Sequence, residues 1–219
     1  MAAGGSGGID FAAFAEALVV GDRPSAETLL RRAVYRHGSR AGVIAELIEP
    51  AMYLVGHRWQ TGLIGVADEH RASNLLRMLD SLLPPTPLEI RVAAGSRCLL
   101  ATLEGERHDL GLRLVAMAME DAGWEVDLLG ADLPVSELVR VALDLAPHMV
   151  GLSFALPEVA GGPEARRAVD ELVGQEIPVV VGGFAFRAAP ELLDRLGPVS
   201  YVPNAGVLAP RVSEFGRVY

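Results

Sequence analysis

The sequence contains no lysine, so all 19 of its basic residues are arginine. A chain without lysine cannot form the Schiff base that holds pyridoxal phosphate or retinal. It also lacks the lysine on which the phosphate loop of nucleotide hydrolases depends. The single cysteine, Cys98, excludes an internal disulfide and a multi-cysteine zinc site.

Long apolar runs and a surplus of basic residues are also missing. No apolar stretch reaches the ~18 residues that span a bilayer, and the start, MAAGGSGG, has no basic region followed by an apolar run. The net charge of −9 disfavours direct binding to nucleic acid. With 51% hydrophobic residues, the chain can bury a sizeable core. We expect a cytoplasmic protein without direct DNA binding, with a flexible tail over residues 1–8.

The first half of the chain has apolar residues at helical spacing. Residues 9–83 are predicted to form a bundle of four amphipathic helices. Asp22 is the expected N-cap of the second helix, which has a proline in its first turn. Pro50 lies inside the third helical pattern, 41–59, and predicts a kink there. The fourth pattern, about 66–83, is expected to turn these side chains inward: Ala72, Leu75, Leu76, Leu79 and Leu82.

A Pro-rich segment, 84–96, is the expected linker, because three prolines among four residues cannot continue a helix. In the rest of the chain, 97–219, short apolar runs alternate with helical segments, which is typical of a parallel sheet wrapped by helices. The predicted fold is therefore α/β with an all-α N-terminal part: a four-helix bundle followed by a Rossmann-like (flavodoxin-like) five-stranded parallel sheet. The five expected strands are Arg97–Leu103, Glu125–Leu129, Met149–Phe154, Ile177–Val181 and Val199–Val202.

Sheets of this kind bind ligands at the carboxyl ends of their strands. After the first strand, Glu106, His108 and Gly111 form a Glu-x-His-x-x-Gly pattern on a loop that enters a helix. A loop histidine can offer one ring nitrogen to a metal ion, while a carboxylate two residues away holds the other. The glycine lets a bulky group approach the backbone. Taken alone, the pattern also fits a solvated histidine beside a charged neighbour.

Small residues end two further strands. Ser153 ends the third, and Gly182 and Gly183 end the fourth. Together with the first strand end they predict a slot at the edge of the sheet, although the glycine pair alone also fits an ordinary tight turn. The dinucleotide fingerprint G-x-G-x-x-G is absent after the first strand, and a receiver domain of similar topology is disfavoured because it needs a lysine after the last strand.

This set of strand ends resembles the cobalamin-binding domain of methionine synthase, corrinoid proteins and mutases over about the last 120 residues. The resemblance implies that cobalamin, as adenosylcobalamin or another form, is the cofactor. It implies that His108 is the lower ligand of the cobalt and that Glu106 holds its ring, with the serine and the two glycines lining a pocket for the displaced nucleotide tail. The family pattern begins with Asp where this chain has Glu106, and it usually has Leu where this chain has Ala155.

The helical half carries a second pattern: Trp59-Gln60, a gap of eight residues, then Glu69-His70. It resembles the bundle of CarH-type light sensors, whose pattern is Trp-His, eight residues, Glu-His. The resemblance implies that the bundle caps the upper corrin face, with the tryptophan over the upper cobalt ligand and the Glu-His pair enclosing it. Gln60 replaces the histidine that ligates cobalt after illumination, so that state requires His57 or His70 instead. Alternatively, the tryptophan is bundle core, and the glutamine and His70 are exposed surface residues.

These resemblances predict a cobalamin-dependent light sensor without enzymatic activity. Sensors of this type carry a DNA-binding domain ahead of the bundle, for which the sequence leaves no room, so we expect signalling through a protein partner or a homodimer. The glutamine also allows a photocobilin-like sensor, in which non-covalently held biliverdin is a second chromophore on the upper corrin face. The alternatives are a corrinoid methyl-carrier subunit of a methyltransferase and a cobalamin storage or delivery protein.

Overall fold

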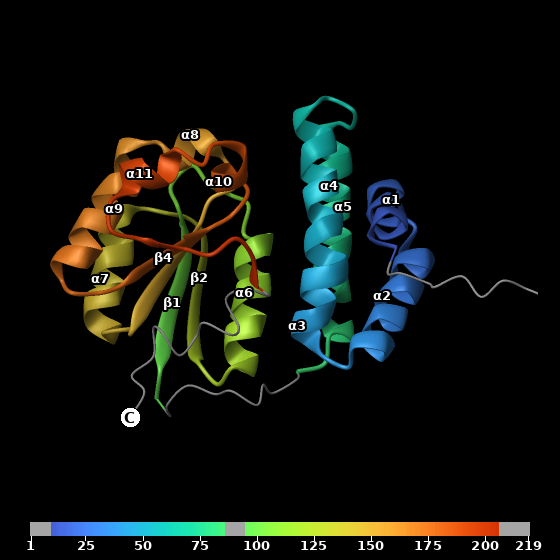
Figure 1. Ribbon diagram of the computed structural model, residues 1–219, viewed down its shortest axis with the longest axis horizontal. Helices are drawn as coiled ribbons and strands as arrows, with labels where there is room; N and C mark the ends of the chain where they lie inside the picture. The colour runs from blue at the N-terminus through green and yellow to red at the C-terminus, as the bar shows by residue number, and fades with distance from the viewer. Residues whose placement is uncertain (1–9, 86–94, 206–219) are drawn as a thin grey trace, which may run out of the picture. The chain divides into compact units, whose positions relative to one another are not determined.

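The computed structural model describes residues 10–85 and 95–205. The chain divides into two compact units, Met1–Thr86 and Pro87–Tyr219 (Figure 1). The predicted tail at 1–8 lies outside the described residues, as do residues 86–94 of the predicted linker and 206–219 of the predicted sheet domain. In the described segments, no helix has both the length and the apolar character needed to cross a membrane.

Residues 10–85, the described part of the first unit, form helices and their connections and contain no strand. In this unit, α1 contacts α2, α4 and α5, and α4 contacts α5. Its core is made of side chains that face these contacts, among them Phe14, Leu18, Leu30, Ile44 and Leu76, all with no exposed surface. The elements are α1 (Phe11–Val20), α2 (Arg23–His37), α3 (Arg40–Val43), a π-helix (Ile44–Ile48), α4 (Glu49–Gln60), α5 (Val66–Leu79) and a 3₁₀ turn (Asp80–Leu82).

Two local predictions for this unit can be compared with the structure. Asp22 is the N-cap of α2, since its carboxylate accepts a hydrogen bond from the backbone N–H of Ser25 at 3.2 Å. Pro50 lies in the first turn of α4, directly after the π-helix. Because proline has no N–H to donate back along a helix, regular α-helical bonding is interrupted here. The N–H of Glu49 instead reaches back five residues to the carbonyl of Ile44, so the predicted irregularity is a π segment.

The end of the fourth helical pattern differs from the prediction at one position. Leu82 was expected to face inward, but it is half-buried and Leu83 is buried instead. The cause is that α5 ends at Leu79 and continues as a 3₁₀ turn, in which successive side chains are rotated by about 120° and not by the roughly 100° of an α-helix.

The second unit confirms the predicted sheet. Its strands are all parallel, in the order β2-β1-β3-β4-β5, which is the flavodoxin-like order. The strands are β1 (Arg97–Leu103), β2 (Glu125–Leu133), β3 (Met149–Ser153), β4 (Val179–Gly182) and β5 (Ser200–Tyr201). Thus β1 has the predicted bounds, and β3, β4 and β5 differ from prediction by one or two residues at their ends.

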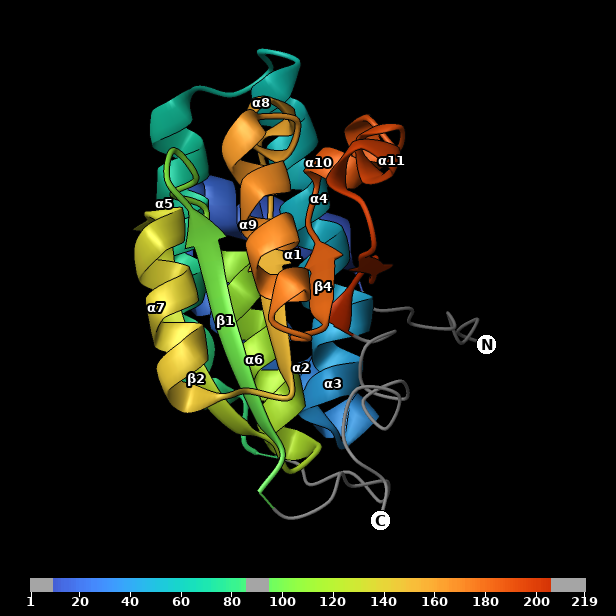
Figure 2. The same cartoon turned by 90° about the vertical axis from the view of Figure 1, so that its left-hand side faces the viewer.

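Helices cover both faces of this sheet, with α7 and α9 on one face and α6 on the other (Figures 1 and 2). Alternate residues of β1 point to opposite faces, as strand geometry requires. Leu99 and Leu103 join the core under α7 and α9, whereas Cys98 and Leu100 join the core under α6. The helices are α6 (Leu110–Asp121), α7 (Val135–Leu145), α8 (Pro157–Ala160), α9 (Pro163–Gly174), α10 (Ala185–Ala188) and α11 (Leu192–Leu196).

The strand β2 is four residues longer than predicted. Its pairing with β1 moves from Leu100↔Leu128 to Ala101↔Gly130 and then to Leu103↔Leu133, so β2 contains extra residues at two points. These irregularities have the form of β-bulges, and they occur where the sequence Gly-Ala-Asp-Leu-Pro has the composition of a turn. The bulged end of β2 lies beside the loop that follows β1, because the N–H of Glu104 donates to the carbonyl of Leu133 at 3.0 Å.

Candidate functional site

The predicted strand-end residues of the sheet unit meet at one edge. In the flavodoxin-like order, β1 and β3 are neighbouring strands. The chain that follows β1 leads to a helix on one face of the sheet, and the chain that follows β3 leads to helices on the opposite face. The loop after β1 carries Glu106 and His108, and the loop after β3 follows Ser153. Ser153 is in turn the register partner of Gly182 on β4. The site is therefore built at the place where this fold class binds its ligands.

The pair of Glu106 and His108 is the centre of this edge. The carboxylate of Glu106 is fully buried, and its Oε1 lies 2.6 Å from the ring Nδ1 of His108. The same oxygen accepts the backbone N–H of His108 at 3.0 Å. The histidine side chain keeps 33% of its surface exposed. A buried anion thus fixes the orientation of a ring that a ligand can still reach.

The other oxygen of Glu106 joins this loop to the loop after β3. Its Oε2 accepts the backbone N–H groups of Ala155 and Leu156, each at 2.8 Å. Burial is the largest single influence on this carboxyl and raises its pKa. The bonds from the His108 ring and from the three backbone N–H groups together outweigh burial, so the pKa is lowered. Glu106 is therefore ionised at neutral pH.

This ionised partner decides which atom of His108 suits a metal ion. We assign the proton of the neutral ring to Nδ1, because Nδ1 faces a carboxylate that can only accept. A neutral imidazole that donates from Nδ1 carries its lone pair on Nε2. A carboxylate that holds Nδ1 of a histidine in this way leaves Nε2 as the ring atom suited to bind a metal ion.

The glycines at this edge have different physical roles. A Cβ at Gly111 would be in ordinary van der Waals contact with the hydroxyl of Ser153 at 3.7 Å, so the start of α6 lies directly beside Ser153. A Cβ at Gly182 would lie 2.8 Å from the carbonyl oxygen of Val202. At Gly183, with φ +112°, it would collide with the backbone of Phe154. Packing of the chain itself requires Gly182 and Gly183, and their part in a ligand pocket stays a prediction.

Two residues of this edge were not singled out from the sequence. The hydroxyl of Thr102 is fully buried and donates to the carbonyl of Glu106 at 2.6 Å. Asp132, on the bulged end of β2, accepts the backbone N–H of Gly105 at 2.8 Å. This bond lowers the pKa of Asp132 against a smaller opposing effect of burial, and Arg107 lowers it further. The sequence signal that could have identified Asp132 is the Gly-x-Asp-x-Pro pattern at residues 130–134, directly after the predicted second strand.

The second predicted set of residues lies around the connection between α4 and α5. Trp59 and Gln60 are the last residues of α4, and the N–H of Gly62 donates to the carbonyl of Trp59 at 3.0 Å. Trp59 is half-buried and Gln60 is exposed. His57, the other possible substitute for the missing histidine, is also exposed.

Glu69 and His70 lie in the first turns of α5. Glu69 is buried, and its Oε1 accepts the hydroxyl of Ser73 at 2.6 Å. Its Oε2 lies 3.7 Å from Nε2 of His70, whose side chain is 66% exposed. The pair thus repeats, in the helical unit, the combination of a buried carboxylate and a reachable imidazole.

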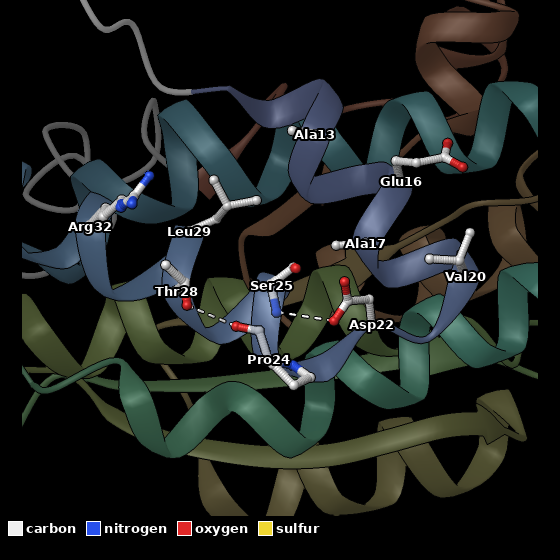
Figure 3. A pocket seen from close by; sticks show the side chains of 10 residues that line it. All are labelled: Ala13, Glu16, Ala17, Val20, Asp22, Pro24, Ser25, Thr28, Leu29 and Arg32. Carbon is white, nitrogen blue, oxygen red and sulfur yellow. Dashed lines mark hydrogen bonds between the residues drawn. The ribbon is translucent and has the colours of Figure 1, made fainter.

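The helical unit also has an open groove of about 570 Å³ between α1 and α2 (Figure 3). Ala17 and Leu29 contribute apolar surface, and Asp22 and Thr28 contribute polar atoms. Those polar atoms already serve the helix, since Asp22 caps α2 and the Thr28 hydroxyl donates to the carbonyl of Pro24. None of the predicted site residues lines this groove.

Both units of the chain are similar to known protein families. Two family models, each described as a B12 binding domain, match residues 11–82 and 96–203. The chain is 30% identical over 118 residues to dimethylamine corrinoid protein 3 of Methanosarcina mazei, covering 52% of this chain and 68% of that protein. This chain belongs to the B12-binding family. Cobalamin is therefore the cofactor class that its site residues have to fit.

Two other known proteins are similar over more of the chain. The HTH-type transcriptional repressor CarH of Myxococcus xanthus is 34% identical over 153 residues, which are 69% of this chain and 50% of that repressor. The chain thus spans half the length of this relative. The monomethylamine corrinoid protein of Methanosarcina barkeri has a similar fold, with a TM-score of 0.71 and 18% identity, over 92% of this chain and 95% of that one.

The residues present fit a cobalt-centred cofactor at two points. They supply one reachable imidazole, His108, whose Nδ1 is held by a buried anion. They also bring two small residues, Gly111 and Ser153, together at the edge of the sheet, with no bulky side chain at either position. A single histidine ligand is sufficient for a metal that a macrocycle already surrounds.

Proposed function

We propose that this chain is a cobalamin-dependent light sensor without enzymatic activity, in which His108 is the lower ligand of the cobalt. The proposal includes a capping role for the helical unit, with Trp59, Glu69 and His70 toward the upper face of the corrin. Output is through a protein partner or through self-association.

One observation carries the choice of a sensor. The similarity to the CarH repressor covers 153 residues. The whole sheet unit has only 133 residues, Pro87–Tyr219, so this match includes part of the helical unit. The helical unit holds the Trp59 and Glu69-His70 pattern by which the chain resembles CarH-type light sensors. The similarity to the dimethylamine corrinoid protein covers only 118 residues, which is fewer than the sheet unit contains, so this match need not include any of the helical unit.

Within this proposal each residue has a defined task. Glu106 keeps the proton of His108 on Nδ1 and presents Nε2 to the cofactor. Through the backbone N–H groups of Ala155 and Leu156, Glu106 couples the position of the histidine to the loop after β3. Bound cobalamin supplies a bond between cobalt and its upper ligand that light can break. Glu69, held by Ser73, places a carboxylate oxygen 3.7 Å from the ring of His70 in the helical unit.

A methyl-carrier subunit is the second candidate, and the 30% identity to a dimethylamine corrinoid protein favours it. A carrier needs the same lower-ligand site, so the sheet edge does not separate the two functions. The residues that separate them are in the helical unit, at Trp59, Gln60 and the Glu69-His70 pair.

Absorption spectra before and after illumination test the proposal. The full chain is loaded with adenosylcobalamin in the dark, alongside His108→Ala and the matched control Arg107→Ala, whose side chain on the same loop is 83% exposed. We expect a stable new cobalt spectrum after light in the wild type and in Arg107→Ala, and its loss in His108→Ala. An illuminated spectrum equal to that of the free cofactor would favour the carrier, and failure to bind cobalamin would overturn both functions.

Two additions to this experiment test the remaining parts of the proposal. Gln60 leaves the upper face without the histidine of CarH-type sensors, and we propose non-covalent biliverdin as a second chromophore there. A red-absorbing band that forms only with added biliverdin supports this, and identical spectra with and without it contradict it. Light scattering in the dark and after illumination tests self-association, which a monomer in both states excludes.

A further inference from the structure

The loop that carries His108 is held from the side by a neighbouring strand. The carbonyl oxygen of Glu106 accepts the buried hydroxyl of Thr102 at 2.6 Å and the backbone N–H of Asp132 at 3.0 Å. The same N–H of Asp132 lies 3.1 Å from the Thr102 hydroxyl, which accepts it. The backbone of Glu106 is thus fixed by Asp132 on β2, 26 residues further along the chain.

The side chain of Asp132 holds the residues on either side of Glu106. Its Oδ1 accepts the backbone N–H of Gly105 at 2.8 Å, and its Oδ2 lies 3.3 Å from Nε of Arg107. The Arg107 contact is exposed and contributes little by itself. The contacts to Gly105 and to the Glu106 carbonyl fix the backbone of the loop just ahead of His108.

Asp132 makes these contacts from an unfavourable backbone conformation. Its φ is +61°, in the left-handed region that non-glycine residues seldom occupy. It lies at a bulge of β2, between the pairs Ala101↔Gly130 and Leu103↔Leu133. Bulges redirect side chains near functional sites, and a strained conformation persists only where its surroundings determine it. Here the determining surroundings are the loop of His108.

We propose that Asp132 is a positioning residue for the lower cobalt ligand, because it locks the loop 104–108 in the conformation that presents His108. This inference rests on the proposed ligation by His108. It assigns to the end of β2 a role that the strand-end motifs of β1, β3 and β4 do not include. Asp132 acts through the loop and not by contact with the cofactor.

Substitutions at Asp132 can separate its hydrogen bonds from its backbone conformation. In Asp132→Gly, the glycine adopts the positive φ without strain, but the hydrogen bond between the side chain and the N–H of Gly105 is lost. Asp132→Asn tolerates the same φ and keeps an oxygen for that bond. The matched control is Glu176→Gly, because Glu176 also has a positive φ of 60° but is an exposed turn residue between α9 and β4.

Two readouts follow these variants in the full chain. The first is amide hydrogen exchange of Gly105, Glu106 and His108 in the protein without cofactor. The second is the electron paramagnetic resonance spectrum of the Co(II) cobalamin complex of [¹⁵N]histidine-labelled protein. A ¹⁵N ligand splits the cobalt lines into doublets, whereas the cofactor's own ¹⁴N base gives triplets, so the spectrum reports the fraction with histidine bound.

We expect Asp132→Gly to exchange these amides about 10- to 100-fold faster and to bind His108 to cobalt correspondingly more weakly. Asp132→Asn and Glu176→Gly should match the wild type in both readouts. Wild-type exchange and wild-type doublets in Asp132→Gly would overturn the inference. A wild type that shows only triplets would instead overturn ligation by His108, and the exchange rates would then still decide whether Asp132 holds the loop.

Discussion

At the scale of single residues, Glu106 is the most constrained group of the site. A fully buried carboxylate is costly unless its charge is compensated, and here it accepts bonds from a histidine ring and three backbone N–H groups. Its side chain is one methylene longer than the Asp of the resembling families. The extra length suits a carboxylate that accepts hydrogen bonds from both the loop after β1 and the loop after β3.

The first prediction concerns Glu106 and pH. Its folded pKa is lowered, so the unfolded chain binds a proton first as pH falls through the ordinary glutamate value of about 4.3. The stabilisation from Glu106 is therefore complete above that value and is lost as pH falls through the lower folded pKa. Glu106→Gln should lose about 2–4 kcal/mol at pH 6, because an amide leaves buried donors unsatisfied, and should show a weaker dependence on acid.

Denaturant unfolding from about pH 6 to pH 3 measures this effect. The background variant Trp59→Phe leaves Trp124, which is 4% exposed in the core of the sheet unit, as the reporter of that unit alone. Equal dependence on pH in the Glu106→Gln variant and its parent would contradict the prediction.

The second prediction separates two kinds of glycine. Gly111→Val places a branched side chain against the hydroxyl of Ser153, which an added Cβ would already contact at 3.7 Å. We expect the unit to fold but to bind cobalamin at least about 10-fold more weakly. Gly183→Ala forces a Cβ into the backbone of Phe154 at a positive φ and should cost about 2–4 kcal/mol of stability. Cofactor titration and thermal unfolding of both variants measure this, and the opposite pattern would refute it.

At the scale of elements, the sequence predicts those features that a short stretch of residues determines by itself. The Asp22 cap and the strand β1 follow from short stretches of sequence, and the structure agrees with both. The length of β2 could not be predicted in this way, because Gly130 and Asp132 have turn composition and only pairing with β1 keeps them in the sheet. Backbone N–H donors such as that of Ala155 have no sequence signature at all.

The third prediction concerns the start of α2. Asp22→Ala removes the side chain that caps this helix and should destabilise the helical unit by about 1 kcal/mol, with Asp22→Asn close to the wild type. The bonds to Ser25 lower the pKa of Asp22, so the difference between the aspartate and alanine variants should shrink in strong acid. Unfolding followed by Trp59 fluorescence in a Trp124→Phe background measures this, and a pH-independent difference would argue against the cap.

At the scale of the whole molecule, the two units differ in composition as well as in fold. Residues 1–86 contain 8 arginines and 9 acidic residues, whereas residues 87–219 contain 11 arginines and 19 acidic residues. The negative charge of the chain thus belongs almost entirely to the sheet unit. The predicted linker rests on three prolines among residues 84–87, because proline is tolerated only in the first turn of a helix and a run of prolines cannot continue one. A motif on each side of it indicated cobalamin, since ligand chemistry selects residue types at fixed spacing.

The last prediction uses the fact that each unit has one tryptophan, Trp59 in α4 and Trp124 ahead of β2. If the helical unit caps the cofactor, as proposed, cobalamin should quench Trp59 in a Trp124→Phe variant, because the corrin absorbs where tryptophan emits. Illumination should then partly restore this emission as the cap moves. His108→Ala, which weakens cofactor binding at the sheet edge, should reduce both changes together. Unchanged Trp59 emission in a chain with fully bound cobalamin would mean that the helical unit does not cover the corrin, and this would contradict the capping role proposed for it.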